Sequence, residues 1–291
     1  MQWSSMLNPR LPRLAAVVAA TIVASCLASC ATPMPTHIPT PTTSTYVEIP
    51  PQNVPGSNMP KGALPAILTL PKGKPPYPAV ILLHGCTGHI PRLWAQRLAD
   101  WGYASVGPAS YTPRGYSRVC SGPAETRAVT PQDRAGDVVS TALWLRTQPE
   151  IDSNRIAVVG FSNGGWTAMW VTQRRYQQMY PGLIKAAVSY YGNCDRAAEH
   201  GTVPLLVLVG EADNWADPAR RCREFGAQLM PNQNFQIHTY PGVVHSFDDD
   251  DPQSVVYSYG HPLQYNAEAA QDSFIRTRAF LDRYIGPSAG P

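Results

Sequence analysis

Short apolar runs rich in β-branched residues alternate along this chain with longer stretches that carry apolar residues at helical spacing. This alternation is typical of an α/β fold with a mostly parallel central sheet and helices on both faces. Ligands bind such sheets at the carboxyl ends of the strands, so a functional site is expected in the loops after the strands. The predicted strands are 65–70, 79–83, 104–107, 156–160, 186–190, 205–209 and 235–240, and the predicted helices are 93–101, 132–148, 164–173, 218–229 and 267–284.

One turn in this pattern carries a serine between glycines. Residues 160–165 read Gly-Phe-Ser-Asn-Gly-Gly and join the predicted strand 156–160 directly to the predicted helix 164–173. A Gly-x-Ser-x-Gly turn in that context is typical of a nucleophile elbow, in which small neighbours let strand and helix approach closely while the serine backbone is strained. The sequence therefore predicts an α/β-hydrolase fold with Ser162 as the nucleophile.

A serine hydroxyl is a weak nucleophile, so it needs a base that an acid orients. In this fold the three residues follow the order Ser, Asp, His. The loop after the predicted strand 205–209 contains Asp213, and the loop after the last predicted strand contains His245. We predict Asp213 as the acid and His245 as the base, with Glu211 and Asp217 as alternatives for the acid.

An acyl-transfer site also needs two backbone N–H groups that stabilise an oxyanion. Asn163, which follows the nucleophile, is predicted to supply the first. The second is expected from residues 84–88, His-Gly-Cys-Thr-Gly, which follow the second predicted strand. Within them we predict Cys86 as the donor, with Thr87 as the alternative, and a structural hydrogen-bonding role for His84.

The first 30 residues read as a bacterial export signal. Arg10 and Arg13 form its positive start, and the apolar run 14–27 is shorter than the roughly 20 residues of a transmembrane helix. The run ends in Leu27-Ala28-Ser29-Cys30, which resembles the lipobox of bacterial lipoproteins. We therefore predict a lipid on Cys30 that anchors the protein at a membrane on the periplasmic side. The alternatives are lipidation of Cys26, or cleavage without a lipid, which gives a soluble periplasmic or secreted protein.

The remaining chain divides by composition. Residues 31–60 are dense in Pro, Thr and Ser and hold hardly any charge, which predicts a disordered tether. Residues 61–286 read as one α/β-hydrolase domain, and residues 287–291 as a disordered tail. The acidic run 248–251 is typical of a solvated loop rather than of a metal site.

Four cysteines belong to the predicted domain. An even number in an oxidising compartment suggests two disulfides, for which three pairings exist. We favour Cys86 with Cys120 and Cys194 with Cys222, because each pair lies in loops that follow neighbouring strands of the expected sheet. Buried free thiols are the alternative.

The charge balance excludes a nucleic acid partner. The chain has 23 basic and 20 acidic residues, and without Arg10 and Arg13 the counts are 21 and 20. Binding to phosphates relies on clustered Lys and Arg, which this balance does not provide. We expect a monomer.

These pieces together resemble the dienelactone hydrolase family of α/β-hydrolases over most of the predicted domain. The resemblance implies that Ser162, Asp213 and His245 take the triad positions, that no cofactor is needed, and that the substrate is a small-molecule ester. The matching pieces are residues 84–88, 113–115, 160–165, 210–215 with Cys222, 245–247 and the closing helix 266–281.

One departure from this resemblance bears on the substrate. The family's namesakes use a cysteine nucleophile, whereas this chain has Ser162 at that position. A broader activity on carboxylic esters is therefore favoured over cleavage of dienelactone itself. The alternatives are an acyltransferase, an amidase or a peptidase that uses the same triad, and a non-catalytic binding lipoprotein that kept the fold.

Overall fold

An eight-stranded sheet forms the centre of the domain in the computed structural model, which describes residues 42–120, 128–231, 233–249 and 255–286. In spatial order the sheet consists of β1 (Thr43–Ile49), β2 (Leu64–Leu70), β4 (Ala104–Pro108), β3 (Tyr77–Leu83), β5 (Ile151–Phe161), β6 (Ala186–Tyr190), β7 (Leu205–Gly210) and β8 (Phe235–Tyr240). The last six strands in this order run parallel to one another, and β1 and β2 add two antiparallel strands at one edge.

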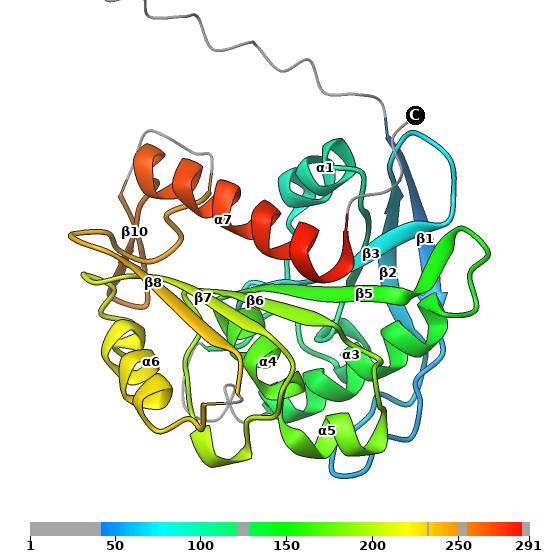
Figure 1. Cartoon of the computed structure of the whole chain (residues 1–291), viewed down its shortest axis with the longest axis horizontal. Helices are drawn as coiled ribbons and strands as arrows, with labels where there is room; N and C mark the ends of the chain where they lie inside the picture. Colours follow the sequence, from blue (N-terminus) through cyan, green and yellow to red (C-terminus); the bar gives the residue numbers. More distant parts are fainter. Residues whose placement is uncertain (1–41, 121–127, 232, 250–254, 287–291) are drawn as a thin grey trace, which may run out of the picture. The chain divides into compact units, whose positions relative to one another are not determined.

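Helices cover both faces of this sheet (Figure 1). One face carries α1 (Arg92–Asp100) and α7 (Ala267–Ile285), and the other carries α3 (Pro131–Leu145), α4 (Asn163–Val171), α5 (Arg174–Met179) and α6 (Pro218–Ala227). The predicted α/β architecture is confirmed.

The side chains of β3 show how one strand serves two hydrophobic layers. Ala79, Ile81 and Leu83 belong to the layer packed with α3 and α4, whereas Val80 and Leu82 belong to the layer packed with α1 and α7. Successive side chains of a strand point to opposite faces, so a strand covered on both sides is apolar at every position. This is why residues 79–83 are apolar at every position rather than at every second position.

Helix α3 begins with a reciprocal cap. The Thr130 hydroxyl accepts a hydrogen bond from the Asp133 N–H (3.2 Å), and the Asp133 carboxylate accepts one from the Thr130 N–H (2.9 Å). Pro131 occupies the first helical position, where an N–H would have no partner within the helix. The cap fixes where the helix starts, and therefore where Arg134, in its first turn, enters the protein interior.

The edge of the sheet differs from the sequence prediction. We expected residues 31–60 to be a disordered tether, but Thr43–Ile49 forms strand β1, paired along its whole length with β2. Ile49 and Val54 are completely or almost completely buried. Composition misled here because an edge strand exposes most of its side chains and so needs few apolar residues. Strand β1 is held in the domain mainly by its backbone hydrogen bonds to β2.

Three shorter elements were also not predicted. Helix α5 follows α4 after only two residues, so its periodicity merges with that of its neighbour. Strands β9 (Val256–Ser258) and β10 (His261–Leu263) form a small separate hairpin near the C-terminal part of the domain. An isolated bridge from Leu263 to His245 connects this hairpin to the loop that contains the predicted base.

Both disulfides of the structure have the pairing that we favoured. Cys86 is bonded to Cys120 and Cys194 to Cys222, with S–S distances of 2.02 and 2.04 Å. The first joins the loop after β3 to the segment that follows the turn at Thr112–Arg114. The second joins the loop after β6 to helix α6.

The predicted export signal, Cys30, residues 31–41 of the predicted tether and the tail 287–291 lie outside the described residues. Within the described part of the chain, no helix is both long enough and apolar enough to cross a bilayer.

Strand β1 provides a test of the revised domain boundary. Ile49→Ala removes a side chain with no exposed surface and should lower the free energy of unfolding by about 2–5 kcal/mol. Tyr46→Ala, in the same strand but 78% exposed, should change it by less than about 0.5 kcal/mol. Urea unfolding with the disulfides intact measures both. Equal and negligible effects of the two substitutions would mean that residues 42–49 do not belong to the folded domain.

Candidate active site

Ser162 lies in the sharp turn between β5 and α4, with φ 54° and ψ −116°. A positive φ is strained for a residue with a side chain, so the surrounding structure must hold it there. A Cβ added at Gly160 would lie 2.1 Å from the Gly164 carbonyl oxygen, and one at Gly164 would lie 2.1 Å from the Leu83 carbonyl oxygen. The glycines of the motif are therefore required by the close contact between helix α4 and the sheet.

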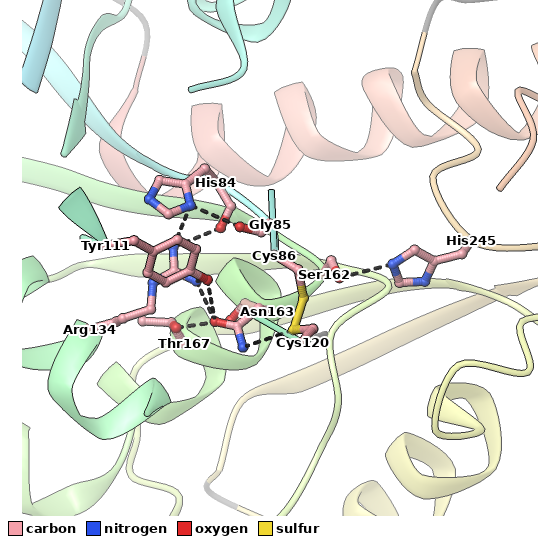
Figure 2. The surroundings of a disulfide bond; sticks show 10 residues. All are labelled: His84, Gly85, Cys86, Tyr111, Cys120, Arg134, Ser162, Asn163, Thr167 and His245. Atoms are coloured by element: carbon pink, nitrogen blue, oxygen red, sulfur yellow. Dashed lines mark hydrogen bonds between the residues drawn. A yellow bond between two sulfur atoms is a disulfide. The ribbon is translucent and has the colours of Figure 1, made fainter. Parts of the chain in front are cut away.

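His245 connects Ser162 to Asp213. Its Nε2 lies 2.9 Å from the Ser162 Oγ (Figure 2), and its Nδ1 lies 2.7 Å from Asp213 Oδ2. A carboxylate only accepts hydrogen bonds, so Nδ1 carries the proton and Nε2 is free to accept the serine proton. The structure thus brings together the three side chains that the sequence proposed for the triad.

The loops after β7 and β8 hold Asp213 and His245 next to each other. A Cβ on Gly210 would lie 2.1 Å from the Val243 carbonyl oxygen, and the Ala212 N–H donates to the same oxygen (2.9 Å). Asp213 uses its second carboxylate oxygen to accept the Trp215 N–H (2.9 Å). This second bond fixes the rotation of the carboxylate, and so the direction from which it meets His245.

The His245 ring is shielded from water on two sides. It lies 4.5 Å from the Tyr191 ring and 5.0 Å from the Trp215 ring, measured between centroids. Its side chain is only 4% exposed, and that of Asp213 has no exposed surface. A charged pair formed here is therefore weakly screened by solvent.

The two alternative acids are engaged elsewhere. Glu211 accepts a hydrogen bond from the Thr239 hydroxyl (2.8 Å) and pairs with Arg223. Asp217 pairs with Arg220 at 2.6 Å near the start of α6. Of these three carboxylates, Asp213 is the one within hydrogen-bonding distance of His245.

One of the two predicted oxyanion donors directly follows Ser162 in the chain, and the other lies in a separate loop that approaches Ser162. Asn163 is the first residue of α4, and N–H groups in the first turn of a helix have no partner within the helix. The second segment is the loop after β3, where a Cβ on Gly85 would lie 3.4 Å from the Ser162 Cβ. Cys86, the next residue, lines the same cavity as Ser162.

His84 has the structural role that the sequence suggested. It is buried, and its Nε2 accepts a hydrogen bond from the Ser110 N–H (3.2 Å). The proton of the neutral ring is then on Nδ1, which donates to the Gly85 carbonyl oxygen (2.9 Å). Burial, followed by the nearby charge of Arg134, lowers the pKa of His84 to about 3. The ring therefore stays neutral and keeps this hydrogen bond throughout the physiological range.

A cavity of about 860 Å³ opens beside Ser162 and His245. Phe161, Trp94, Tyr191, Leu93 and Tyr46 are among the side chains that line it. They give the cavity an apolar part, beside the charged side chains of Arg92, Arg97 and Arg118, and this part suits the hydrocarbon portion of an organic substrate.

Asp248, on the wall of this cavity, corrects the expectation of a solvated acidic loop. Its carboxylate is buried and accepts hydrogen bonds from Trp94 Nε1 (2.7 Å) and from the Tyr191 hydroxyl (2.6 Å). Burial raises the pKa of Asp248. Asp250 and Asp251, which complete the acidic run, lie outside the described residues. Among the residues that are described, no group of three or more His, Cys, Asp or Glu side chains could hold a metal ion.

Sequence reasoning missed two of the buried charged residues of this region, Asp248 and Arg134. Arg134 lies behind the nucleophile and contacts Asn163 and His84. Neither residue stands in a motif, because their partners come from distant segments of the chain. An arginine in the first turn of an amphipathic helix is expected to be exposed to solvent unless its neighbours in space are known.

Known proteins resemble this domain over most of its length. The family model of the dienelactone hydrolases matches residues 64–285. A protein of Synechocystis, provisionally named a carboxymethylenebutenolidase, is 25% identical over 262 residues, which span 81% of this chain and 94% of the relative.

Solved structures share the fold at lower identity. A provisionally assigned dienelactone hydrolase from Klebsiella pneumoniae superposes with a TM-score of 0.65 at 23% identity, covering 84% of this chain and all of the other. A thermophilic carboxylesterase from a metagenomic library gives a TM-score of 0.58 at 16% identity, covering 84% of this chain and 90% of the other. The matched residues span nearly the whole folded domain, from β2 to the end of α7, so this chain belongs to the dienelactone hydrolase family of the α/β-hydrolases.

Proposed function

We propose that this protein is an exported serine hydrolase that cleaves carboxylic esters through an acyl-enzyme intermediate. The observation that carries the proposal is the line of hydrogen bonds from Asp213 through His245 to Ser162, with separations of 2.7 and 2.9 Å. A base that is already oriented and aimed at a strained serine beside a cavity is the arrangement that acyl transfer requires.

In the first half of the reaction, His245 Nε2 takes the proton of Ser162 as the Oγ attacks the carbonyl carbon of the ester. The carbonyl oxygen gains the negative charge and accepts hydrogen bonds from the backbone N–H groups of Cys86 and Asn163. The imidazolium is stabilised by the Asp213 carboxylate, which stays ionised. When the tetrahedral intermediate collapses, His245 returns the proton to the departing alkoxide, which leaves as an alcohol.

In the second half, water replaces the alcohol. His245 removes a proton from the water as its oxygen attacks the acyl-enzyme, and the same N–H groups stabilise the second oxyanion. Collapse breaks the bond to Ser162, which regains its proton, and the carboxylic acid is released. An alcohol acceptor in place of water turns the same sequence into acyl transfer, so product analysis with added alcohols separates the two activities.

The substrate class follows from the nucleophile and the cavity. Serine in place of the namesakes' cysteine supports general carboxylic esters rather than dienelactone. The apolar part of the cavity supports substrates with an apolar acyl or alcohol part.

Export and anchoring are the second part of the proposal. The disulfides Cys86–Cys120 and Cys194–Cys222 are compatible with an oxidising compartment. We propose that Cys30 carries the lipid and holds the enzyme at a membrane.

The nucleophile can be tested by labelling. Protein lacking residues 1–30 should hydrolyse p-nitrophenyl acetate and react with a fluorophosphonate, and Ser162→Ala should abolish labelling and lower kcat by at least about 1000-fold. Ser153→Ala, near the start of the strand that leads to Ser162, is the matched control and should label like the wild type. Full activity in Ser162→Ala would show that another residue is the nucleophile.

The acid can be tested by an isosteric change. Asp213→Asn keeps the shape but donates to His245 Nδ1, so it forces the wrong tautomer and should lower kcat by about 10⁴-fold. Glu211→Gln, on the same loop, should leave kcat within about twofold, because Glu211 bonds to Thr239 and Arg223 instead. A larger loss in Glu211→Gln than in Asp213→Asn would reverse the assignment. Steady-state kinetics on the same ester decide between these outcomes.

The anchor can be tested by fractionation of cells that express the full chain. Cys30→Ala should move the protein from the membrane fraction to the soluble fraction, because the acyl chains provide the attachment. Cys26→Ala should leave it in the membrane fraction. Unchanged partitioning of Cys30→Ala would remove the lipid anchor on that residue from the proposal.

A further inference from the structure

We propose that Arg134 is a positioning residue that holds both halves of the oxyanion hole, an inference that rests on the hydrolase activity proposed above. Arg134 lies in the first turn of α3 and has no exposed surface. It is not among the residues that line the cavity of about 860 Å³, so it does not meet the substrate itself. Any effect of Arg134 on the reaction must pass through other residues.

The Arg134 guanidinium reaches toward both donor segments at once (Figure 2). One terminal nitrogen donates to Asn163 Oδ1 at 2.5 Å, and the other donates to the His84 carbonyl oxygen at 2.7 Å. Asn163 begins the helix after the nucleophile, and His84 begins the loop that contains Cys86. A single planar group therefore sets the separation of the two segments.

On the helix side, the contact fixes the residue whose N–H is the first donor. Asn163 Oδ1 also accepts a hydrogen bond from the Tyr111 hydroxyl (3.2 Å), and the Asn163 carbonyl oxygen accepts one from the Thr167 hydroxyl (2.9 Å). With its side chain and its carbonyl group both held, the Asn163 backbone has little freedom to rotate. Its N–H then stays in one direction as the oxyanion forms.

On the loop side, the contact continues through the His84 ring. Arg134 holds the His84 carbonyl oxygen, and His84 Nδ1–H holds the next carbonyl oxygen, that of Gly85 (2.9 Å). In a trans peptide the N–H points away from the C=O of the same unit. Fixing the Gly85 oxygen therefore fixes the opposite direction for the Cys86 N–H, which is the second proposed donor.

The cost of burying Arg134 argues against a role in stability alone. Desolvation of a buried arginine is expensive unless a carboxylate pairs with it. The nearest buried carboxylate, Asp137, is already bonded to both terminal nitrogens of Arg114 at 2.9 Å. Burial lowers the pKa of Arg134, yet a guanidinium stays protonated in proteins. Because Arg114 occupies Asp137, the hydrogen bonds that offset the desolvation of Arg134 are those to Tyr111 and to the two donor segments.

The test compares Arg134→Lys and Arg134→Met with a matched variant, Arg114→Met. Arg114 is a second arginine of the same region with a buried side chain, and it bonds to Asp137, Asn58 and Ser110 rather than to either donor segment. For each variant, p-nitrophenyl acetate kinetics give kcat and KM, phenylboronic acid gives the affinity for a tetrahedral adduct, and thermal melting gives stability.

The Arg134 variants should lose kcat by about 10- to 100-fold, which is less than the loss expected for a deleted oxyanion donor. Lysine cannot span both acceptors, so Arg134→Lys should also lose activity although it keeps the charge. KM should stay within about threefold, and the affinity for phenylboronic acid should fall by the same factor as kcat. Arg114→Met should melt earlier than the wild type yet keep kcat within about threefold.

A second route avoids dependence on a buried arginine variant that fails to fold. Asn163→Ala keeps its backbone N–H and removes the side-chain oxygen that accepts hydrogen bonds from Arg134 and Tyr111, so it should show the same parallel loss of kcat and boronic acid affinity. Where Arg134→Lys is folded, combining it with Asn163→Ala should cost less than the two separate losses multiplied, because both act through one contact.

The proposal is overturned if folded Arg134→Lys and Asn163→Ala keep wild-type kcat and boronic acid affinity. It is also overturned if Arg114→Met loses both quantities as much as the Arg134 variants do, since the effect would then follow general destabilisation. Failure of the proposed function gives a different result, in which the wild type itself neither cleaves the ester nor binds the boronic acid.

Discussion

The close approach of helix α4 to the central strands is the constraint on which the site depends. It leaves no room for a side chain at Gly160 or Gly164, and it places Ser162 in a conformation that costs about 1–3 kcal/mol. Two backbone bonds hold this conformation, from the Ser162 N–H to the Tyr190 oxygen (2.9 Å) and from the Trp166 N–H to the Ser162 oxygen (3.0 Å). The apolar helix α4 packs against β3, β5, β6 and α3, and the burial of its side chains offsets the strain of the turn.

Around this fixed serine, the other groups come from loops that follow the carboxyl ends of the parallel strands. The loops after β3, β7 and β8 provide Cys86, Asp213 and His245, and each is bound to a neighbour by a specific contact. The site is therefore rigid in its reacting atoms although it is built from loops. The cavity beside it, by contrast, extends to the exposed side chains of Leu93 and Tyr46.

The sequence predicted the parts of the molecule that carry local signals. Ser162 stands between glycines in the pattern that is typical of a nucleophile elbow. Asp213 follows the continuous apolar run 205–209, which indicates a buried strand, and His245 follows the run 235–240, in which aromatic and β-branched residues are mixed with polar ones. The structure places these three side chains within hydrogen-bonding distance, and their catalytic roles stay a proposal. Arg134 and Asp248 could not be found in the same way, because what distinguishes them from surface residues is burial among partners far away in sequence.

Strand β1 has a consequence for where the enzyme can act. A fully extended tether of residues 31–60 would reach about 100 Å. Because β1 begins at Thr43, only residues 31–42 can serve as the tether, and they reach at most about 40 Å. If Cys30 holds a lipid as proposed, the shorter segment limits the catalytic domain to a thin layer beside the membrane. Esters presented at that surface would then meet the enzyme far more often than esters dissolved in the compartment at large.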